Sequence, residues 1–130
     1  MAASYFKPEL VVLESRITPS DVSITGTILG IAPTAGATNA LFVSNTETTI
    51  TLYDEAETFG NIPAGWTKSA GDHQLEGPKG DINWISASLG AEDDFFDGSG
   101  SSIGLGIQGG LGDDIIYGGS ANDDLNGGEG

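Results

Sequence analysis

The sequence predicts an all-β protein, on three observations. Apolar and polar residues alternate with a period of two in several short runs, no segment reads as a long helix, and the last third of the chain repeats every nine residues. We expect a small β-sandwich or barrel-like base followed by a short right-handed parallel β-roll. The expected organisation is an extended N-terminal arm at 1–18, a β base domain at 19–88 and a glycine- and Asp-rich β-roll at 89–130.

The first half of the chain is divided into short strands by glycine, proline and small polar residues. Residues 1–18 have no clean helical stripe and contain Pro8, so they predict an extended arm. The expected elements that follow are a strand over Ser20–Ile31 bent at Gly26, a loop over Pro33–Thr38, and a hairpin of two strands, Ala40–Ser44 and Thr48–Tyr53, around Asn45-Thr46-Glu47.

The second part of the base predicts one more strand at Phe59–Ile62, then a polar loop over Ser69–Lys79 and a strand over Ile82–Leu89 that leads into the repeats. Trp66 is expected to be a core or interface residue. In the strand before the repeats, Ile85, Ala87 and Leu89 share one face, so Trp84 lies on the other. An exposed tryptophan on a sheet predicts a contact with another protein.

The repeat reads LGAEDDFFD, GSGSSIGLG, two extra residues, GGLGDDIIY, GGSANDDLN and GGEG. The unit Gly109–Tyr117 fits the nonapeptide G-G-x-G-x-D-x-U-x at every position. Glycines permit tight turns, and the apolar eighth residue of each unit points inward. We therefore expect Phe96, Leu105, Ile116 and Leu125 to line the interior.

Two nonapeptides make one coil, so turn 89–94 is expected to face turn 109–114, and turn 98–103 to face turn 118–123. The first pairing predicts a Ca²⁺ site formed by Asp94, Asp114 and carbonyl groups around Gly110 and Gly112. The second pairing offers Asp123 but has Ile103 in place of the other Asp, which predicts a weakened site. The segment 127–130 would add only backbone carbonyls to the Asp114 turn. The alternative is a roll, or a disordered tail, that binds no metal.

These 42 residues resemble the RTX (repeats-in-toxin) calcium-binding family, which implies Ca²⁺ as the bound ion. Charge agrees with a cation requirement. The repeat segment holds nine acids and no base: Glu92, Asp93, Asp94, Asp97, Asp113, Asp114, Asp123, Asp124 and Glu129. Without calcium we expect like charges to loosen this segment.

The whole chain is acidic, with a net charge of −15 and four basic residues, so nucleic acid and anionic membrane are not expected partners. It has no cysteine, which excludes disulfides and thiolate metal sites. The opening residues show no secretory signal pattern. His73 is the only histidine and no G-x-S-x-G motif is present, so we expect no enzymatic activity.

Short motifs in residues 16–89 resemble the head spike base and capsid decoration proteins of tailed phages and gene transfer agents. The similar runs are Ile17-Thr18-Pro19-Ser20-Asp21, Asn39-Ala40-Leu41-Phe42-Val43, Thr49-Ile50-Thr51-Leu52, Phe59-Gly60-Asn61-Ile62-Pro63-Ala64-Gly65, and Asp81-Ile82 with Ser86-Ala87. Trp66–Lys79 departs from the family pattern in being longer and less apolar.

This resemblance implies a non-enzymatic virion protein on the outer surface of the capsid. It would form a homo-oligomer, a trimer or a pentamer, dock on the major capsid protein and project a calcium-stabilised roll. The alternative is a fragment of a secreted, extracellular RTX-type adhesin or exoenzyme. A generic β-sandwich of another function also remains open for the base.

Overall fold

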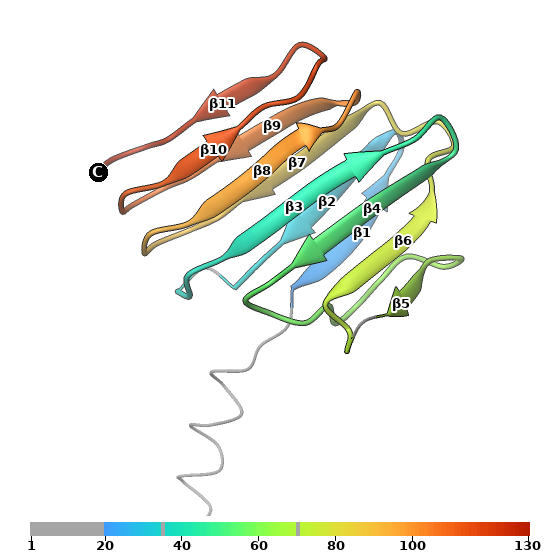
Figure 1. Cartoon of the computed structure of the whole chain (residues 1–130), viewed down its shortest axis with the longest axis horizontal. Coiled ribbons are helices and arrows are strands. Elements are labelled where there is room, and N and C mark those ends of the chain that lie inside the picture. The colour runs from blue at the N-terminus through green and yellow to red at the C-terminus, as the bar shows by residue number, and fades with distance from the viewer. Residues whose placement is uncertain (1–19, 35, 70) are drawn as a thin grey trace, which may run out of the picture.

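The computed structural model describes residues 20–34, 36–69 and 71–130, and in these residues it consists of β-strands without a helix (Figure 1). The prediction of an all-β fold is confirmed. The arm expected at 1–18 lies outside the described residues. The strands are β1 (Asp21–Thr25), β2 (Ile28–Ala32), β3 (Ala40–Asn45), β4 (Thr49–Asp54), β5 (Thr67–Ser69), β6 (Gln74–Pro78), β7 (Trp84–Ser88), β8 (Phe95–Gly100), β9 (Gly104–Gln108), β10 (Ile115–Tyr117) and β11 (Asp124–Asn126).

Two mixed sheets form the two layers of the molecule. One has the strand order β1-β2-β7-β9-β11 and the other has the order β10-β8-β3-β4-β6-β5. Their facing sides share one hydrophobic core, to which the first sheet contributes Leu29, Ile85 and Leu105 and the second Leu41, Leu52 and Phe96. This is the arrangement of a small β-sandwich. Among the described residues no helix is long and apolar enough to cross a membrane.

The N-terminal strand expected over Ser20–Ile31 is a hairpin instead. β1 pairs antiparallel with β2, and Thr25 lies opposite Ile28, which leaves Gly26 and Thr27 as a two-residue loop. Gly26 has a φ of +64°, a left-handed conformation that two-residue hairpin loops require. The glycine thus reverses the chain where the alternation alone predicted a bend.

The hairpin around Asn45-Thr46-Glu47 is confirmed, because β3 pairs antiparallel with β4 and Asn45 lies opposite Ile50. The prediction of a loop over Ser69–Lys79 is wrong, since β5 and β6 form an antiparallel pair there. Its polar composition hid an alternation in which Leu75 and Gly77 are buried between exposed neighbours. The prediction of a strand at Phe59–Ile62 is also wrong. Phe59 makes only an isolated bridge to Ser20, although its side chain is buried.

From β7 onward, successive strands alternate between the sheets, and each pairs in parallel with the strand two places further along the chain. Trp84 lies opposite Gly104, Phe95 opposite Ile115, and Gly106 opposite Asp124. The first coil of this winding also pairs with the base, because β2 is parallel to β7 and β3 is parallel to β8. Both sheets and the core therefore continue across position 88/89, where we placed a domain boundary.

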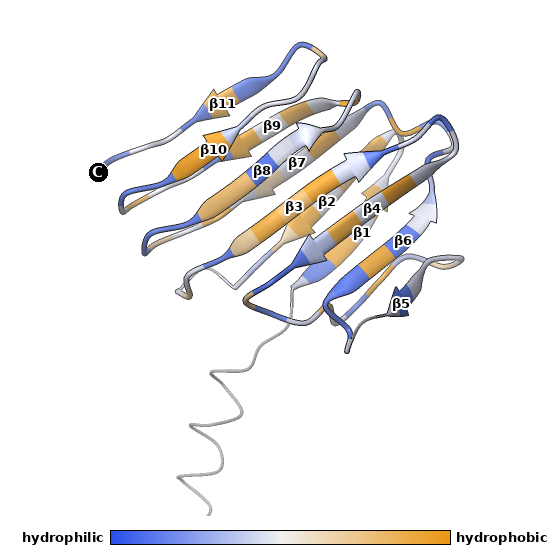
Figure 2. Ribbon diagram, in the orientation of Figure 1, coloured by the Kyte–Doolittle hydropathy of each residue, from blue (hydrophilic) through white to orange (hydrophobic). Residues whose placement is uncertain are grey.

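Strands β10 and β11 each lie at one end of their sheet (Figures 1 and 2). Burial of the repeat segment decreases toward these two strands. Phe96 and Leu105 are fully buried, and Ile116 packs partly against the core. Leu125, which we expected to line the interior, is 39% exposed. β11 is the last strand of its sheet, and among the described residues no further strand covers its side.

Candidate metal centre

Three parallel strands of the second sheet begin side by side, and a polar residue precedes each of them. The register places Ala40 of β3 opposite Phe95 of β8, and Phe95 opposite Ile115 of β10. The residues one position earlier are Asn39, Asp94 and Asp114. Backbone hydrogen bonds tie these positions together, since Phe95 N donates to Asn39 O over 2.9 Å and Ile115 N donates to Asp94 O over 2.9 Å.

A second set of hydrogen bonds, made by side chains, runs across the same three strands. It joins Asn39, Asp94 and Asp114, and we call it the Asn39–Asp94–Asp114 ladder. Asp94 Oδ1 accepts hydrogen bonds from Asn39 N at 2.8 Å and from Asn39 Nδ2 at 3.0 Å. Asp114 Oδ1 accepts from Asp94 N at 2.9 Å. Each carboxylate thus uses its Oδ1 to accept from the backbone N–H of the preceding residue in the ladder, and its Oδ2 is left for another partner.

The remaining oxygens of the ladder are buried and have no hydrogen-bond donor among the described residues. They are Asp94 Oδ2, Asp114 Oδ2 and Asn39 Oδ1. Asn39 is fully buried and Asp94 is 3% exposed. Buried polar atoms without a partner are rare because leaving them unsatisfied costs free energy. Carboxylate and amide oxygens are the ligands that Ca²⁺ prefers, so this set fits the predicted ion.

Burial raises the pKa of Asp94 above its ordinary value. The hydrogen bonds from the Asn39 backbone and side chain act in the opposite direction, and the neighbouring carboxylates of Asp114 and Asp93 raise the pKa further. Burial makes the ionised form of Asp94 less favourable in free energy, and a cation bound beside the carboxylate would offset this cost.

Gly110 and Gly112 lie in the turn before Asp114, stacked on turn 89–94 as expected. Leu111 N donates to Gly90 O at 2.9 Å. Both glycines have left-handed φ values, +100° and +106°, and a Cβ on either would overlap a backbone carbonyl, that of Gly90 or of Glu92. Only glycine permits this close approach of the two turns.

The C-terminal residues continue the stack on the other side of turn 109–114. Glu129 N donates to Gly110 O at 2.8 Å, and Gly112 N donates to Glu129 O at 3.0 Å. Segment 127–130 therefore lies against the Asp114 turn, where we expected it.

Asp123 does not join the ladder. Turn 118–123 lies at the opposite end of the strands (Figure 1), and both oxygens of Asp123 accept backbone hydrogen bonds, from Leu105 N at 2.9 Å and from Gly119 N at 2.8 Å. Its predicted role as a metal ligand stays a prediction, and its visible role is to hold two backbone segments. In the described part of the chain, no three His, Cys, Asp or Glu side chains are grouped so as to hold a metal ion.

Asn39 is the member of the ladder that sequence reasoning missed. Fifty-five residues separate it from Asp94, and no repeat links the two positions. The available signal was that Asn39 directly precedes a predicted strand, as Asp94 and Asp114 do.

The only histidine lies apart from the ladder. His73 Nδ1 is 2.7 Å from the backbone oxygen of Asp54, whereas the Asp54 carboxylate accepts from Ser20 Oγ at 3.1 Å. In this arrangement the imidazole and the carboxylate point to different partners, unlike the relay of a catalytic triad.

Comparison of the chain with protein-family models, with curated proteins and with solved structures found no match.

Proposed function

We propose that the protein is a non-enzymatic structural protein whose coiled repeat segment is held to its base by Ca²⁺ at the Asn39–Asp94–Asp114 ladder. The observation that carries this proposal is the set of three buried oxygens without a partner, Asp94 Oδ2, Asp114 Oδ2 and Asn39 Oδ1. Asn39 belongs to the base and both aspartates to the repeats. A cation held between them would join the two parts and offset the repulsion of the acidic turns.

Within this class we propose a capsid decoration or head spike component on the outer surface of a phage-like virion. The support is the resemblance of residues 16–89 to such proteins. The partners would be the major capsid protein and further copies of this chain, as a trimer or a pentamer. With nine acidic residues and no basic residue, the repeat segment would be solvated best on the outside of a particle.

A row of aromatic side chains on the outer face of the second sheet supports self-association. Ring centroids are 6.0 Å apart for Tyr53 and Phe42, 5.4 Å for Phe42 and Phe95, and 5.9 Å for Phe95 and Tyr117. Tyr53 and Tyr117 are exposed, and the two phenylalanines are partly buried. Aromatic residues are enriched in the cores of protein interfaces, so we assign the contact between copies to this row.

The experiment that tests the calcium site is thermal unfolding at free Ca²⁺ of about 1 µM and about 2 mM, which brackets sensor and extracellular affinities. Calcium at about 100 times its dissociation constant stabilises the folded state by about 2.7 kcal/mol. For a chain of this size the melting temperature should rise by about 10 °C. Asp94→Asn and Asp114→Asn should remove most of this rise.

The matched control is Asp113→Asn, which removes the same charge from an exposed neighbour in the same turn. It should leave the calcium response intact. A wild-type melting temperature that is equal at both calcium levels would refute the site. Equal loss of response in the control and in Asp114→Asn would show that only bulk charge matters.

Sedimentation of the same samples tests the assembly. A closed oligomer at both calcium levels, reduced to monomer by Tyr117→Ala, is the expected result. The alternative function, a fragment of a secreted RTX-type adhesin or exoenzyme, is favoured by the match of Gly109–Tyr117 to the nonapeptide. It predicts a monomer that folds only in high calcium, and a type I exporter gene nearby instead of capsid and portal genes.

A further inference from the structure

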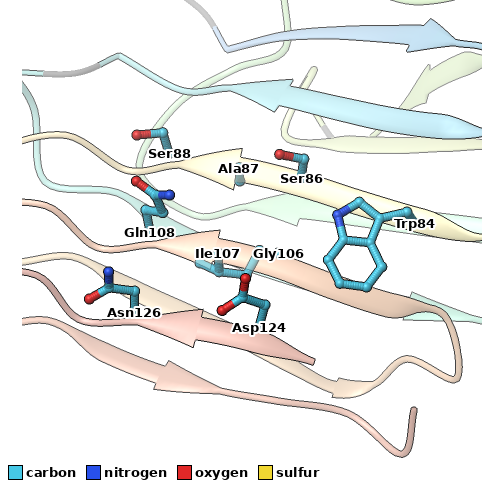
Figure 3. A pocket seen from close by; sticks show the side chains of 9 residues that line it. All are labelled: Trp84, Ser86, Ala87, Ser88, Gly106, Ile107, Gln108, Asp124 and Asn126. Carbon is cyan, nitrogen blue, oxygen red and sulfur yellow. The ribbon is translucent and has the colours of Figure 1, made fainter. Parts of the chain in front are cut away.

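We propose that the outer face of the first sheet carries a binding site for a neutral saccharide, in a groove beside Trp84. The groove has a volume of about 410 Å³ and runs over strands β7, β9 and β11 (Figure 3). The side chains that the groove offers to a ligand are those of Trp84, Ser86, Ser88, Gln108, Asp124 and Asn126. The proposal does not depend on the calcium site, which lies at the strand ends of the other sheet.

Trp84 lies on a floor made of glycine. Trp84 is opposite Gly104 in the register, and a Cβ on Gly104 or Gly106 would come within 2.7 or 2.8 Å of atoms of the indole. The missing side chains allow the ring to lie against β9. The other tryptophan, Trp66, lies on Gly77 in the same way, but it is 6% exposed and belongs to the core. Trp84 is only partly buried and remains open to a ligand.

Polar side chains continue from the indole in two rows across the strands. The register aligns Ser86, Gly106 and Asp124 in one row, and Ser88, Gln108 and Asn126 in the next. These hydroxyl, carboxylate and amide groups lie beside the groove in Figure 3.

Most of this hydrogen-bonding capacity is free. Among the described residues the side chains of Ser86, Ser88 and Gln108 have no hydrogen-bond partner, and neither has the indole N–H of Trp84. Asn126 Oδ1 accepts from Gly128 N at 2.9 Å, which leaves its amide N–H groups to donate.

The chemistry of the groove selects a sugar among small ligands. An indole face packs against the C–H groups of a pyranose ring, because the negative face of the aromatic system attracts their partial positive charge. Hydroxyl groups around the ring both donate and accept, which suits amides, serines and one carboxylate. No cationic side chain lines the groove and the chain carries a net charge of −15, so an anionic saccharide would be repelled. The volume is at the lower end of the range of about 300–1,000 Å³ for small-molecule sites, which suits a short oligosaccharide.

The test is titration of the full chain, in 2 mM Ca²⁺, with neutral hexasaccharides of the malto, cello, xylo and chito series, by calorimetry and by tryptophan fluorescence. We expect one series to bind and to change the fluorescence of Trp84, since Trp66 is buried. Trp84→Ala should weaken binding by at least about tenfold. Gln108→Ala, which removes an exposed side chain without a hydrogen-bond partner in the described part of the chain, should weaken it less while the melting temperature stays unchanged.

The matched control is Tyr117→Ala on the outer face of the other sheet, and it should bind the saccharide like the wild type. Because these probes are short and monovalent, self-association does not alter the affinity per chain. Binding by none of the four series, or binding unaffected by Trp84→Ala and Gln108→Ala, would overturn the proposal. A loss of self-association in Trp84→Ala without saccharide binding in the wild type would also overturn it, and would assign Trp84 to a subunit contact.

Discussion

Phe96→Ala should unfold the base together with the repeats. Phe96 lies in β8, within the repeat segment, and is fully buried. Its strand is bonded to the base on one side, where Phe96 lies opposite Leu41, and to the next coil on the other, where it lies opposite Ile116. If this core is one cooperative unit, removing the ring destabilises residues on both sides of position 88.

The magnitude follows from the burial. Truncating a fully buried phenylalanine to alanine costs about 3–5 kcal/mol, through the lost transfer free energy and the cavity left behind. This is a large part of a domain's usual stability of about 5–15 kcal/mol. At about 4 °C per kcal/mol for a chain of this size, the melting temperature should fall by about 10–20 °C.

The assay uses Trp66, which packs on Gly77 of the base, in a Trp84→Phe background, because Trp84 lies against Gly104 and Gly106 of the repeat segment. Trp66 fluorescence reports the base, and far-ultraviolet circular dichroism reports all strands. Both transitions should coincide and shift together in Phe96→Ala. Leu125→Ala, a truncation at a partly exposed position in the same segment, should cost less than about 1 kcal/mol. A tryptophan transition that stays at its wild-type temperature in Phe96→Ala would refute the single core and support the boundary at 88/89.

Three further predictions test local features. Gly110→Ala should cost about 2–5 kcal/mol in urea unfolding, because it combines a left-handed φ with overlap on a backbone carbonyl, whereas Gly26→Ala, left-handed with nothing within 4 Å, should cost only about 1–2 kcal/mol. Asp123→Ala should lower stability by about 1–3 kcal/mol with or without calcium, since it leaves two backbone N–H groups unpaired, and the exposed Asp124→Ala should not. Burial raises the pKa of Asp54 above its ordinary value of 3.8, so the folded state holds this proton more tightly than the unfolded state. Wild-type stability relative to Asp54→Asn should therefore fall as the pH rises above 3.8 through the raised pKa, and a constant difference from about pH 4 to pH 7 would contradict the assignment.

The nonapeptide period predicted which turns of the repeat segment stack, because the spacing of the turns follows from local sequence. Residues 89–94 and 109–114 stack as expected, since two units and the extra residues Ile107 and Gln108 add up to the offset of 20 between Asp94 and Asp114. The base was harder to predict. Gly26 reverses the chain instead of bending it, and the pair of β5 and β6 has a composition that is typical of loops.

The missing ladder residue shows where local patterns stop being informative. Asn39 reaches Asp94 only because β3 and β8 pair in parallel, and no short motif encodes a pairing between strands so far apart in the chain. Once that pairing is known, Asn39 occupies the position that Asp94 and Asp114 hold in the next two strands. The nine-residue period begins after the base, so it contains no signal for Asn39.

The base therefore acts as the first layer of the coil stack. A repeat winding needs a terminal layer that covers its first coil, and here β2 and β3 supply the parallel neighbours of β7 and β8. The Asn39–Asp94–Asp114 ladder is consistent with this role. Its first member, Asn39 in the base, is an amide, whereas Asp94 and Asp114 in the repeats are carboxylates. Asn39 donates to Asp94 from its backbone and its side chain without adding a third buried negative charge. A buried acid at position 39 would add repulsion at the start of the stack, whereas the amide keeps an oxygen for a cation and lets the acidic coils follow.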